Sequence, residues 1–183
     1  GKIEGVETTS GSVKTRTVIN AAGPWAGVVG QMAGVRIPIV PIRRQMFTTT
    51  NMPEIAHENF PFVIDFARSL YFHREGDGLL IGMSNPNERS GFDQNVDDDF
   101  ELTNLEAAAA RLPGLVRAGR VAHWAGLYEV TPDAHPIFGK TPVDGFLTVA
   151  GFFFLRFLLG PSAGRSFAEW VLATSSNPAD ASA

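Results

Sequence analysis

The sequence predicts an α+β fold, and three observations indicate it. Short segments of alternating or continuous apolar residues, bounded by Gly, Pro, Asn and Ser, predict strands at 44–49, 62–65, 70–74, 79–83, 121–128 and 145–150. Glu75-Gly76-Asp77-Gly78 supplies a hairpin turn between two of them, which favours a mostly antiparallel sheet. Helical signals stand apart from this run, at 97–112 and from Pro161 onward.

The composition is that of an ordinary soluble globular protein. The 183 residues fit one sizeable domain or parts of two, and 44% hydrophobic residues can fill a core. A net charge of −4 gives no electrostatic footprint for nucleic acid or an anionic membrane. The lack of cysteine excludes disulfides, thiolate chemistry and Cys-based metal sites. No apolar run is long enough to span a membrane, and the N-terminus lacks a signal-peptide pattern, so we expect a cytoplasmic location.

The N-terminal segment predicts a β-hairpin or two neighbouring strands. Residues alternate over 3–8, turn at Ser10-Gly11 and alternate again over 13–19. A natural chain seldom begins on a strand, so we also expect truncation.

Residues 18–35 predict the end of a buried strand, a turn of small residues and a short helix. The strand ends at Ile19, residues 21–23 allow close approach to the backbone, and Pro24 and Gly34 bracket the helix. Such a turn can bind a phosphate or a nucleotide edge. A tight strand-to-helix crossing with nothing bound is the competing interpretation.

The acidic run Asp97-Asp98-Asp99 opens the helix at 97–112. Carboxylates at a helix start are stabilised by the helix dipole, whereas adjacent carboxylates on one turn do not converge on a metal ion. We therefore interpret them as capping residues and predict no metal site. The residues expected on the buried face of this helix are Leu102, Leu105, Ala109 and Leu112.

A dinucleotide-binding loop is suggested at first sight by three glycines, Gly76, Gly78 and Gly82. Their spacing is one residue too long and a strand follows instead of a helix, so we assign them to a hairpin. The four histidines show no metal spacing and lie near no serine nucleophile, and each is predicted to be a satisfied or solvated side chain. They are His57, His73, His123 and His135.

Tyr71 and His73 lie two positions apart on one predicted strand and so point to the same face. If that face lines a pocket, the Tyr71 hydroxyl can bind a substrate carboxylate. An aromatic side chain half-buried on a sheet is the competing interpretation.

The C-terminal third predicts a strand at 145–150 that is buried on both faces and a helix that begins at Pro161. The polar tail at 174–183 is predicted to be disordered. The amphipathic face of the helix consists of Ala163, Phe167, Trp170 and Val171.

Four segments occur in the order that they have in one family. They are VINAAGPWAG (18–27), YFHREGDGLLIG (71–82), GLYEVTPDAHPIFG (126–139) and the frame GF…FLLGPSAGR (151–165). Over nearly its whole length the chain resembles the C-terminal part of FAD-dependent oxidoreductases of the D-amino acid oxidase superfamily. The resemblance is to members such as sarcosine oxidase, glycine oxidase, dimethylglycine dehydrogenase and proline dehydrogenase β-subunits.

The resemblance implies two domains. Residues 1–35 and 126–173 would be the remnant of a Rossmann-like FAD-binding domain that lacks its GxGxxG unit, and residues 36–125 an antiparallel substrate-binding sheet domain with flanking helices. The implied partner is the missing N-terminal FAD-binding half or another subunit, with a homo-oligomer as a further possibility. The implied reaction is hydride transfer from an amino acid or secondary amine, such as sarcosine, glycine or proline, to FAD.

Site residues follow from the resemblance position by position. Tyr71 matches the tyrosine that binds the substrate carboxylate, and Tyr128 stands where glycine oxidase-like members carry a carboxylate-binding arginine. Leu158 replaces a lysine thought to help activate oxygen, and Arg156 would offer a displaced positive charge in its place. A surface or partner-facing arginine is the competing interpretation of Arg156. The implied cofactor-binding residues are Ala22, Gly23, Trp25, Gly126, Gly151, Phe152, Phe157 and Leu158. The helix that starts at Pro161 is expected to point its N-terminus at the flavin.

The chain departs from the family pattern at residues 151–157, where relatives carry GFSGHGF. Phe and Leu side chains here would obstruct the approach of the flavin ring to backbone N–H groups. The alternative is therefore a non-catalytic binding or subunit-interaction module derived from the family. A third possibility is a fragment of a longer gene.

Overall fold

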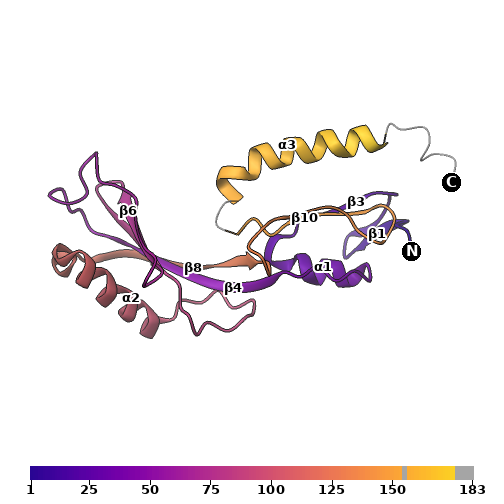
Figure 1. The fold of residues 1–183 in the computed structure, drawn as a ribbon. Coiled ribbons are helices and arrows are strands. Elements are labelled where there is room, and N and C mark those ends of the chain that lie inside the picture. The colour runs from indigo at the N-terminus through magenta and orange to yellow at the C-terminus, as the bar shows by residue number, and fades with distance from the viewer. Residues whose placement is uncertain (154–155, 176–183) are drawn as a thin grey trace. The chain divides into compact units, whose positions relative to one another are not determined.

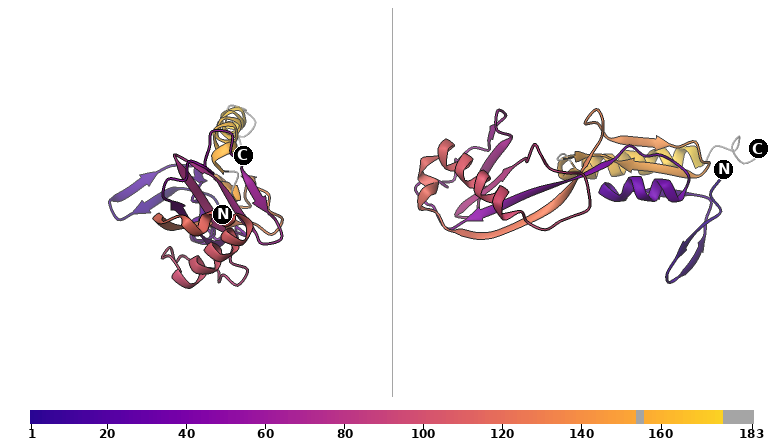
Figure 2. Two further views of the ribbon diagram at one scale, coloured as in Figure 1. Left: turned by 90° about the vertical axis from the view of Figure 1, so that its left-hand side faces the viewer. Right: turned by 90° about the horizontal axis from the view of Figure 1, so that it is seen from below.

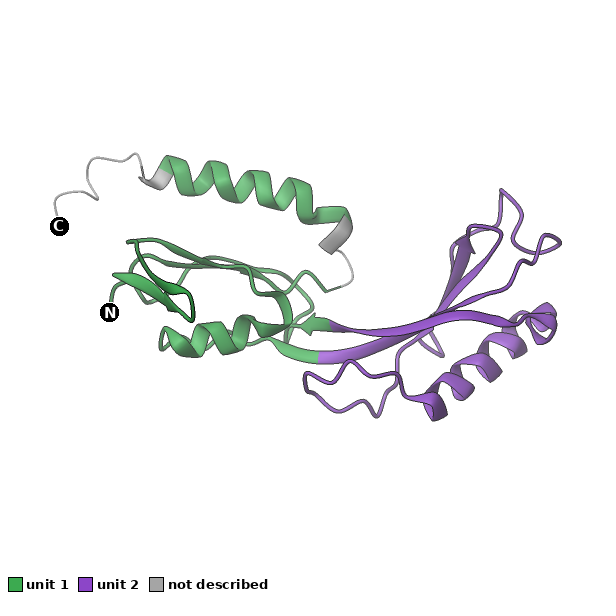
Figure 3. Ribbon diagram, turned by 180° about the vertical axis from the view of Figure 1, so that it is seen from behind, with its two compact units in different colours: residues 1–41, 128–183 green, residues 42–127 purple. Residues whose placement is uncertain are grey.

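The structure is a computed structural model that describes residues 1–153 and 156–175. It confirms the predicted α+β class, with mostly antiparallel strand pairing and three α-helices in the described residues. Contacts between Cα atoms divide the chain into two compact units (Figure 3). Unit 1 contains residues 1–41 and 128–183, and unit 2 contains residues 42–127.

Unit 1 is built on a three-stranded sheet of order β3-β10-β9. β3 (Val18–Asn20) pairs in parallel with β10 (Phe146–Ala150), which pairs antiparallel with β9 (Ile137–Lys140). Helices α1 (Ala26–Met32) and α3 (Arg156–Ser175) lie on opposite faces of this sheet (Figure 1). β10 is covered on both faces, as predicted, whereas β9 was not anticipated from the sequence.

The strand that ends at Ile19 was predicted to be buried, but β3 is only partly buried. Asn20 is buried, but Ile19 is 45% exposed. β3 is the edge strand of the sheet, so its side chains are covered less well than those of the central β10. The core of unit 1 consists of Ala26, Val35, Ile37, Ile39, Phe146 and Ala150.

The predicted N-terminal hairpin is present as β1 (Gly5–Thr8) and β2 (Gly11–Lys14). Gly11 closes the turn with a φ of 128°, which only glycine adopts readily. Every residue of both strands is exposed, and the hairpin stands apart from the sheet of unit 1 (Figure 2).

α3 begins at Arg156 and not at the predicted Pro161. Pro161 lies inside the helix, where its missing N–H removes one backbone hydrogen bond without ending the helix. The predicted helix N-terminus at Pro161 is therefore wrong. The amphipathic face is confirmed, because Phe167 is buried and packs edge-on against Phe138 of β9 with 4.8 Å between ring centroids. Residues 176–183 of the predicted disordered tail lie outside the described residues.

Unit 2 holds a five-stranded sheet of order β5-β6-β7-β4-β8, in which β4 and β8 continue into unit 1. The hairpin predicted at Glu75–Gly78 joins β6 to β7, and Gly76 takes a φ of 59° there. The strands are β4 (Val40–Thr49), β5 (Val63–Asp65), β6 (Leu70–Glu75), β7 (Gly78–Met83) and β8 (Arg120–Val130). The helical elements are α2 (Asp98–Arg111) and the 3-10 helix η2 (Pro113–Arg117).

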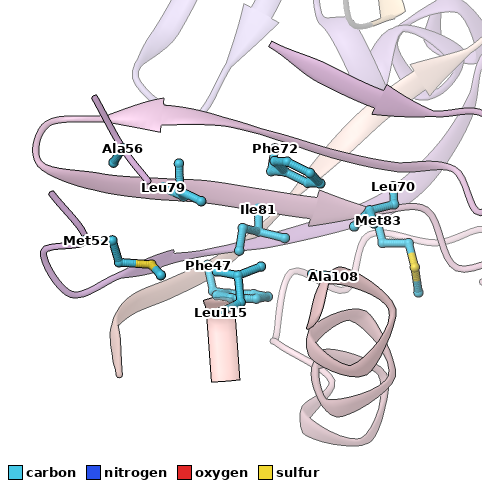
Figure 4. Packing of buried hydrophobic residues seen from close by; sticks show 10 residues of the cluster. All are labelled: Phe47, Met52, Ala56, Leu70, Phe72, Leu79, Ile81, Met83, Ala108 and Leu115. Atoms are coloured by element: carbon cyan, nitrogen blue, oxygen red, sulfur yellow. The ribbon is translucent and has the colours of Figure 1, made fainter. Parts of the chain in front are cut away.

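One face of this sheet packs against α2 and η2, and Figure 4 shows the side chains that meet there. Phe47, Phe72 and Ile81 face Ala108 of α2 and Leu115 of η2. The N-cap prediction is confirmed, since the Asp97 carboxylate accepts a hydrogen bond of 3.1 Å from the backbone N–H of Phe100.

The face that α2 buries differs in part from the predicted one. Leu102 and Leu105 are 57% and 39% exposed, whereas Asn104 and Ala108 are fully buried. Alanine brings the helix backbone close to the sheet, which turns the two leucines toward the flank of the helix. The other two predicted residues, Ala109 and Leu112, do pack against the core.

None of the helices in residues 1–153 and 156–175 combines the length and the apolar character needed to cross a lipid bilayer.

Candidate functional site

The carboxyl ends of the parallel strands β3 and β10 meet at one edge of the unit 1 sheet, and the end of β8 joins them there. Open sheets with parallel strands characteristically bind ligands beyond these ends. Asn20–Gly23, Tyr128–Thr131 and Gly151–Phe153 make up this region, which we call the strand-end cluster.

Glu129 lies at the centre of the strand-end cluster and is only 4% exposed. Its Oε2 accepts a hydrogen bond of 2.9 Å from the backbone N–H of Gly151. A Cβ atom placed on Gly23 would lie 3.6 Å from the same oxygen. One buried carboxylate is therefore hydrogen-bonded to the turn after β10 and lies close to the turn after β3.

The buried side chain of Asn20 fixes the turn after β3. Its Oδ1 accepts a hydrogen bond of 3.3 Å from the N–H of Ala22, and its Nδ2 donates one of 2.9 Å to the carbonyl of Ala26. Gly23 takes a φ of 53°. The helix predicted from Pro24 is accordingly divided into the 3-10 helix η1 (Gly23–Trp25) and α1.

The turn after β10 requires glycine at its first position. Gly151 takes a φ of 83°, and a Cβ atom there would lie 2.5 Å from the Thr131 methyl carbon. The Thr131 hydroxyl is held in place by donating to the carbonyl of His135 over 2.9 Å.

Phe153 occupies a left-handed backbone conformation, with a φ of 54°. Such a conformation is uncommon for a residue with a large side chain. Its ring packs edge-on against Tyr128, with 5.0 Å between ring centroids and an angle of 73° between planes. The aromatic side chain predicted to obstruct this turn is thus packed against β8.

The structure brings five of the predicted site residues into the strand-end cluster: Ala22, Gly23, Tyr128, Gly151 and Phe152. Trp25 follows on η1, while Gly126 and Tyr71 belong to unit 2. Leu158 is on α3 and is 74% exposed. Arg156 and Phe157 also begin α3, but their side chains lie outside the described part of the chain, as do the neighbouring residues 154–155.

In unit 2, Tyr71 lies on the sheet face opposite to the one that packs on α2. Gly82 is its partner in register on β7, and a Cβ atom there would overlap the Tyr71 ring. The hydroxyl of Tyr71 donates a weak hydrogen bond of 3.9 Å to the Met46 sulfur. Phe62 stacks on both Tyr71 and His73, at 5.9 and 5.0 Å between centroids. The prediction that Tyr71 and His73 share a face is confirmed.

A second polar cluster joins α2 to β8. Ligand-type atoms of Asp98, Glu101 and His123 lie within 4.8 Å of one another. The Arg120 guanidinium contacts both Glu101 and His123, and His123 Nδ1 lies 2.6 Å from Glu101. Burial pushes the pKa of Glu101 up, but the hydrogen bonds from Arg120 and His123 outweigh it and hold that pKa below its usual value. We interpret the cluster as an ion-pair network.

Glu129 and Asn20 were not predicted as site residues. A signal for Glu129 was present, because Leu127, Glu129 and Thr131 alternate along one strand and therefore share a face. All three are buried. A charged residue between two buried positions of a strand indicates a carboxylate with a specific partner.

Comparisons with known proteins identify the family. The family described as FAD dependent oxidoreductase matches residues 1–170, and the chain belongs to it. The chain is 33% identical to human mitochondrial sarcosine dehydrogenase over 93% of its length, which is 20% of that protein. It is 32% identical to glycine oxidase from Pseudomonas aeruginosa, over 92% of this chain and 45% of that one.

Among solved structures, L-proline dehydrogenase from P. horikoshii superimposes with a TM-score of 0.80 at 29% identity. The match covers 93% of this chain and 46% of that one. The chain thus spans less than half the length of these relatives.

Proposed function

We propose that this chain forms part of an FAD-dependent oxidoreductase that oxidises an amino acid or a secondary amine. The observation that carries the proposal is the strand-end cluster, where the turn after β3 leaves the backbone of Gly23 open to a ligand at the carboxyl ends of two parallel strands. Relatives named for sarcosine, glycine and proline support this substrate class.

The residues of the strand-end cluster fit a bound cofactor. Among the described residues, a Cβ atom added to Gly23 would have only the Glu129 carboxylate within 4 Å, with the nearer oxygen at 3.6 Å. The backbone of Gly23 is therefore open to a neighbouring group. When bound, FAD supplies the hydride acceptor. The residues proposed to hold it are Ala22, Gly23, Trp25, Gly126, Gly151, Phe152, Phe157 and Leu158.

In the proposed reaction the α C–H bond of the substrate breaks, and the hydrogen leaves with the bonding electron pair as a hydride, for which bound FAD would be the acceptor. The nitrogen lone pair forms the C=N bond of an imine, and the N–H proton passes to solvent. The Tyr71 hydroxyl would bind the substrate carboxylate, with Tyr128 and Arg156 as further candidates for substrate contact. The chain's own contribution is binding and orientation.

The proposal assigns cofactor binding and substrate binding to different parts of the chain. Residues 1–35 and 126–173 would serve the cofactor, and residues 36–125 the substrate. The N-terminal FAD-binding half or another subunit would complete the first part. The edge position of β3 and the partial exposure of Ile19 support this, because an edge strand can pair with a further strand. A cytoplasmic location stays a prediction, since one relative is named as mitochondrial.

The test is whether the protein, expressed with the sequence that precedes residue 1 in its gene, retains FAD through gel filtration. We expect a yellow protein that releases FAD on denaturation. A colourless protein that takes up no added FAD would contradict the proposal.

The second candidate is a non-catalytic binding or subunit-interaction module. It is favoured by exposed apolar side chains on α1, namely Val28 and Met32. A colourless protein that associates through this surface, and loses the association when Met32 and Val28 become Ser, would support it.

A further inference from the structure

We propose that the strand-end cluster binds a hydroxyl-bearing sugar chain of the cofactor, ribityl or ribose, and not its phosphates, with Glu129 as the acceptor for the hydroxyl. The inference rests on the proposed function, because it states which part of FAD this chain contacts. It replaces the expectation that the turn at 21–23 binds a phosphate.

Three of the backbone N–H groups in and after the turn that follows β3 are already used. The N–H of Ala22 bonds to Asn20, that of Trp25 to the Ala22 carbonyl over 3.0 Å, and that of Ala26 to the Gly23 carbonyl. Pro24 has no N–H. A phosphate needs several convergent donors, and α1 has only seven residues. The turn therefore leaves at most the N–H groups of Ala21 and Gly23 for a phosphate, fewer donors than a helix N-terminus offers.

In the turn after β10, the N–H of Gly151 donates to the Glu129 carboxylate over 2.9 Å. The backbone donor that the family resemblance assigned to the flavin is thus taken by a side chain of this protein. Beside both turns lies an acceptor, the Glu129 carboxylate of β8.

Glu129 has capacity for one more hydrogen bond. A carboxylate accepts at both oxygens and donates at neither when ionised. In the part of the chain that the structure describes, Gly151 is its one hydrogen-bond donor, through Oε2. Its carboxylate also lies beside Gly23, where a Cβ atom would stand 3.6 Å away. A phosphate brought to this place would meet a like charge, whereas a sugar hydroxyl would donate to the second oxygen.

The test uses Glu129→Gln in the FAD-binding protein. Glutamine has the same shape, and its amide oxygen can still accept from Gly151, but an NH2 group replaces the second oxygen. The matched control is Glu7→Gln on the exposed β1 strand. Dissociation constants are measured by quenching of flavin fluorescence, for FAD, for an analogue without the ribityl hydroxyls and for an analogue without the adenosine ribose hydroxyls.

We expect Glu129→Gln to weaken FAD binding about 10-fold, in line with the loss of one hydrogen bond to a charged group. The variant should bind one of the two analogues as tightly as the unchanged protein does, because that analogue already lacks the hydroxyl that Glu129 accepts. The analogue that behaves in this way identifies the sugar. Glu7→Gln should bind all three as the unchanged protein does. If the variant folds poorly, the unchanged protein still tests the inference, because it should bind one of the two analogues about 10-fold less tightly than FAD.

Two outcomes would overturn the inference. If the unchanged protein binds FAD but Glu129→Gln has the same affinity, or loses the same factor for FAD and both analogues, then Glu129 only holds Gly151 in place. If the unchanged protein binds no flavin at all, the proposed function fails and this inference fails with it.

Discussion

Gly82 on β7 lies directly beneath the ring of Tyr71 on β6, and the absence of a side chain at Gly82 gives that ring its place on the sheet. The two residues are register partners on the face opposite to α2. The position of the proposed substrate-binding hydroxyl therefore depends on a glycine that has no chemistry of its own.

Replacing Gly82 by alanine should move the Tyr71 ring, since the new methyl group would overlap it. We expect KM for the amino-acid substrate to rise about 10-fold, with a smaller change in kcat, because a displaced hydroxyl loses about one hydrogen bond to a charged group. Steady-state kinetics measure both. Gly91→Ala is the control, as no atom lies within 4 Å of a Cβ at that position. An unchanged KM in Gly82→Ala would contradict a role of Tyr71 in substrate binding.

Tyr71→Phe removes the hydroxyl and leaves the ring in its stack with Phe62. Because the ring stays in this stack, the variant should keep its fold, which circular dichroism checks. Binding of a carboxylate inhibitor such as acetate should weaken roughly 10-fold. Equal inhibitor affinity in both proteins would exclude the proposed contact.

Asn104→Leu should stabilise the protein. Asn104 is fully buried, and in the described residues neither atom of its amide group has a hydrogen-bond partner. A buried polar group without partners costs about 1–3 kcal/mol, so a branched apolar side chain of similar shape should raise the free energy of unfolding by about 1 kcal/mol. Urea denaturation measures it. A fall in stability would show that the Asn104 amide has hydrogen-bond partners in solution.

Glu101→Gln should lower stability at neutral pH by about 1 kcal/mol, because Arg120 and His123 lose a charged acceptor. The folded-state pKa of Glu101 lies below its unfolded value, so its contribution is complete above about pH 4.3 and is lost as the pH falls through the folded pKa. The two proteins should therefore converge in stability in acid. Thermal melts from pH 7 to pH 3 test this, with the exposed Glu106→Gln as control. A difference that stays constant over that range would assign the effect to packing.

The elements that local chemistry determines could be predicted from the sequence. The hairpin at Gly76 and Gly78 and the cap at Asp97 follow from preferences of a few neighbouring residues, and both are present. The buried face of α2 could be predicted only in part, because leucines and alanines both recur along this helix at helical spacing. Which of them is buried depends on how closely the helix approaches the sheet, and that is a property of the tertiary packing.

The candidate site was harder to predict for the same reason. Gly23 and Gly151 could be recognised from small residues after apolar strands, but Glu129 is far from both in the sequence. Only the pairing of β3 with β10, and the position of β8 beside them, brings the carboxylate of Glu129 close to both turns. Likewise, Pro161 indicates a helix start in isolation, whereas α3 continues through it.

The central claim is tested most directly by adding sarcosine, glycine and proline, one at a time and without oxygen, to the FAD-loaded protein. We predict that at least one of them bleaches the flavin absorbance band and yields its imine or the hydrolysis product of that imine. A protein that holds FAD but is bleached by none of them, while dithionite reduces it fully, would contradict the account.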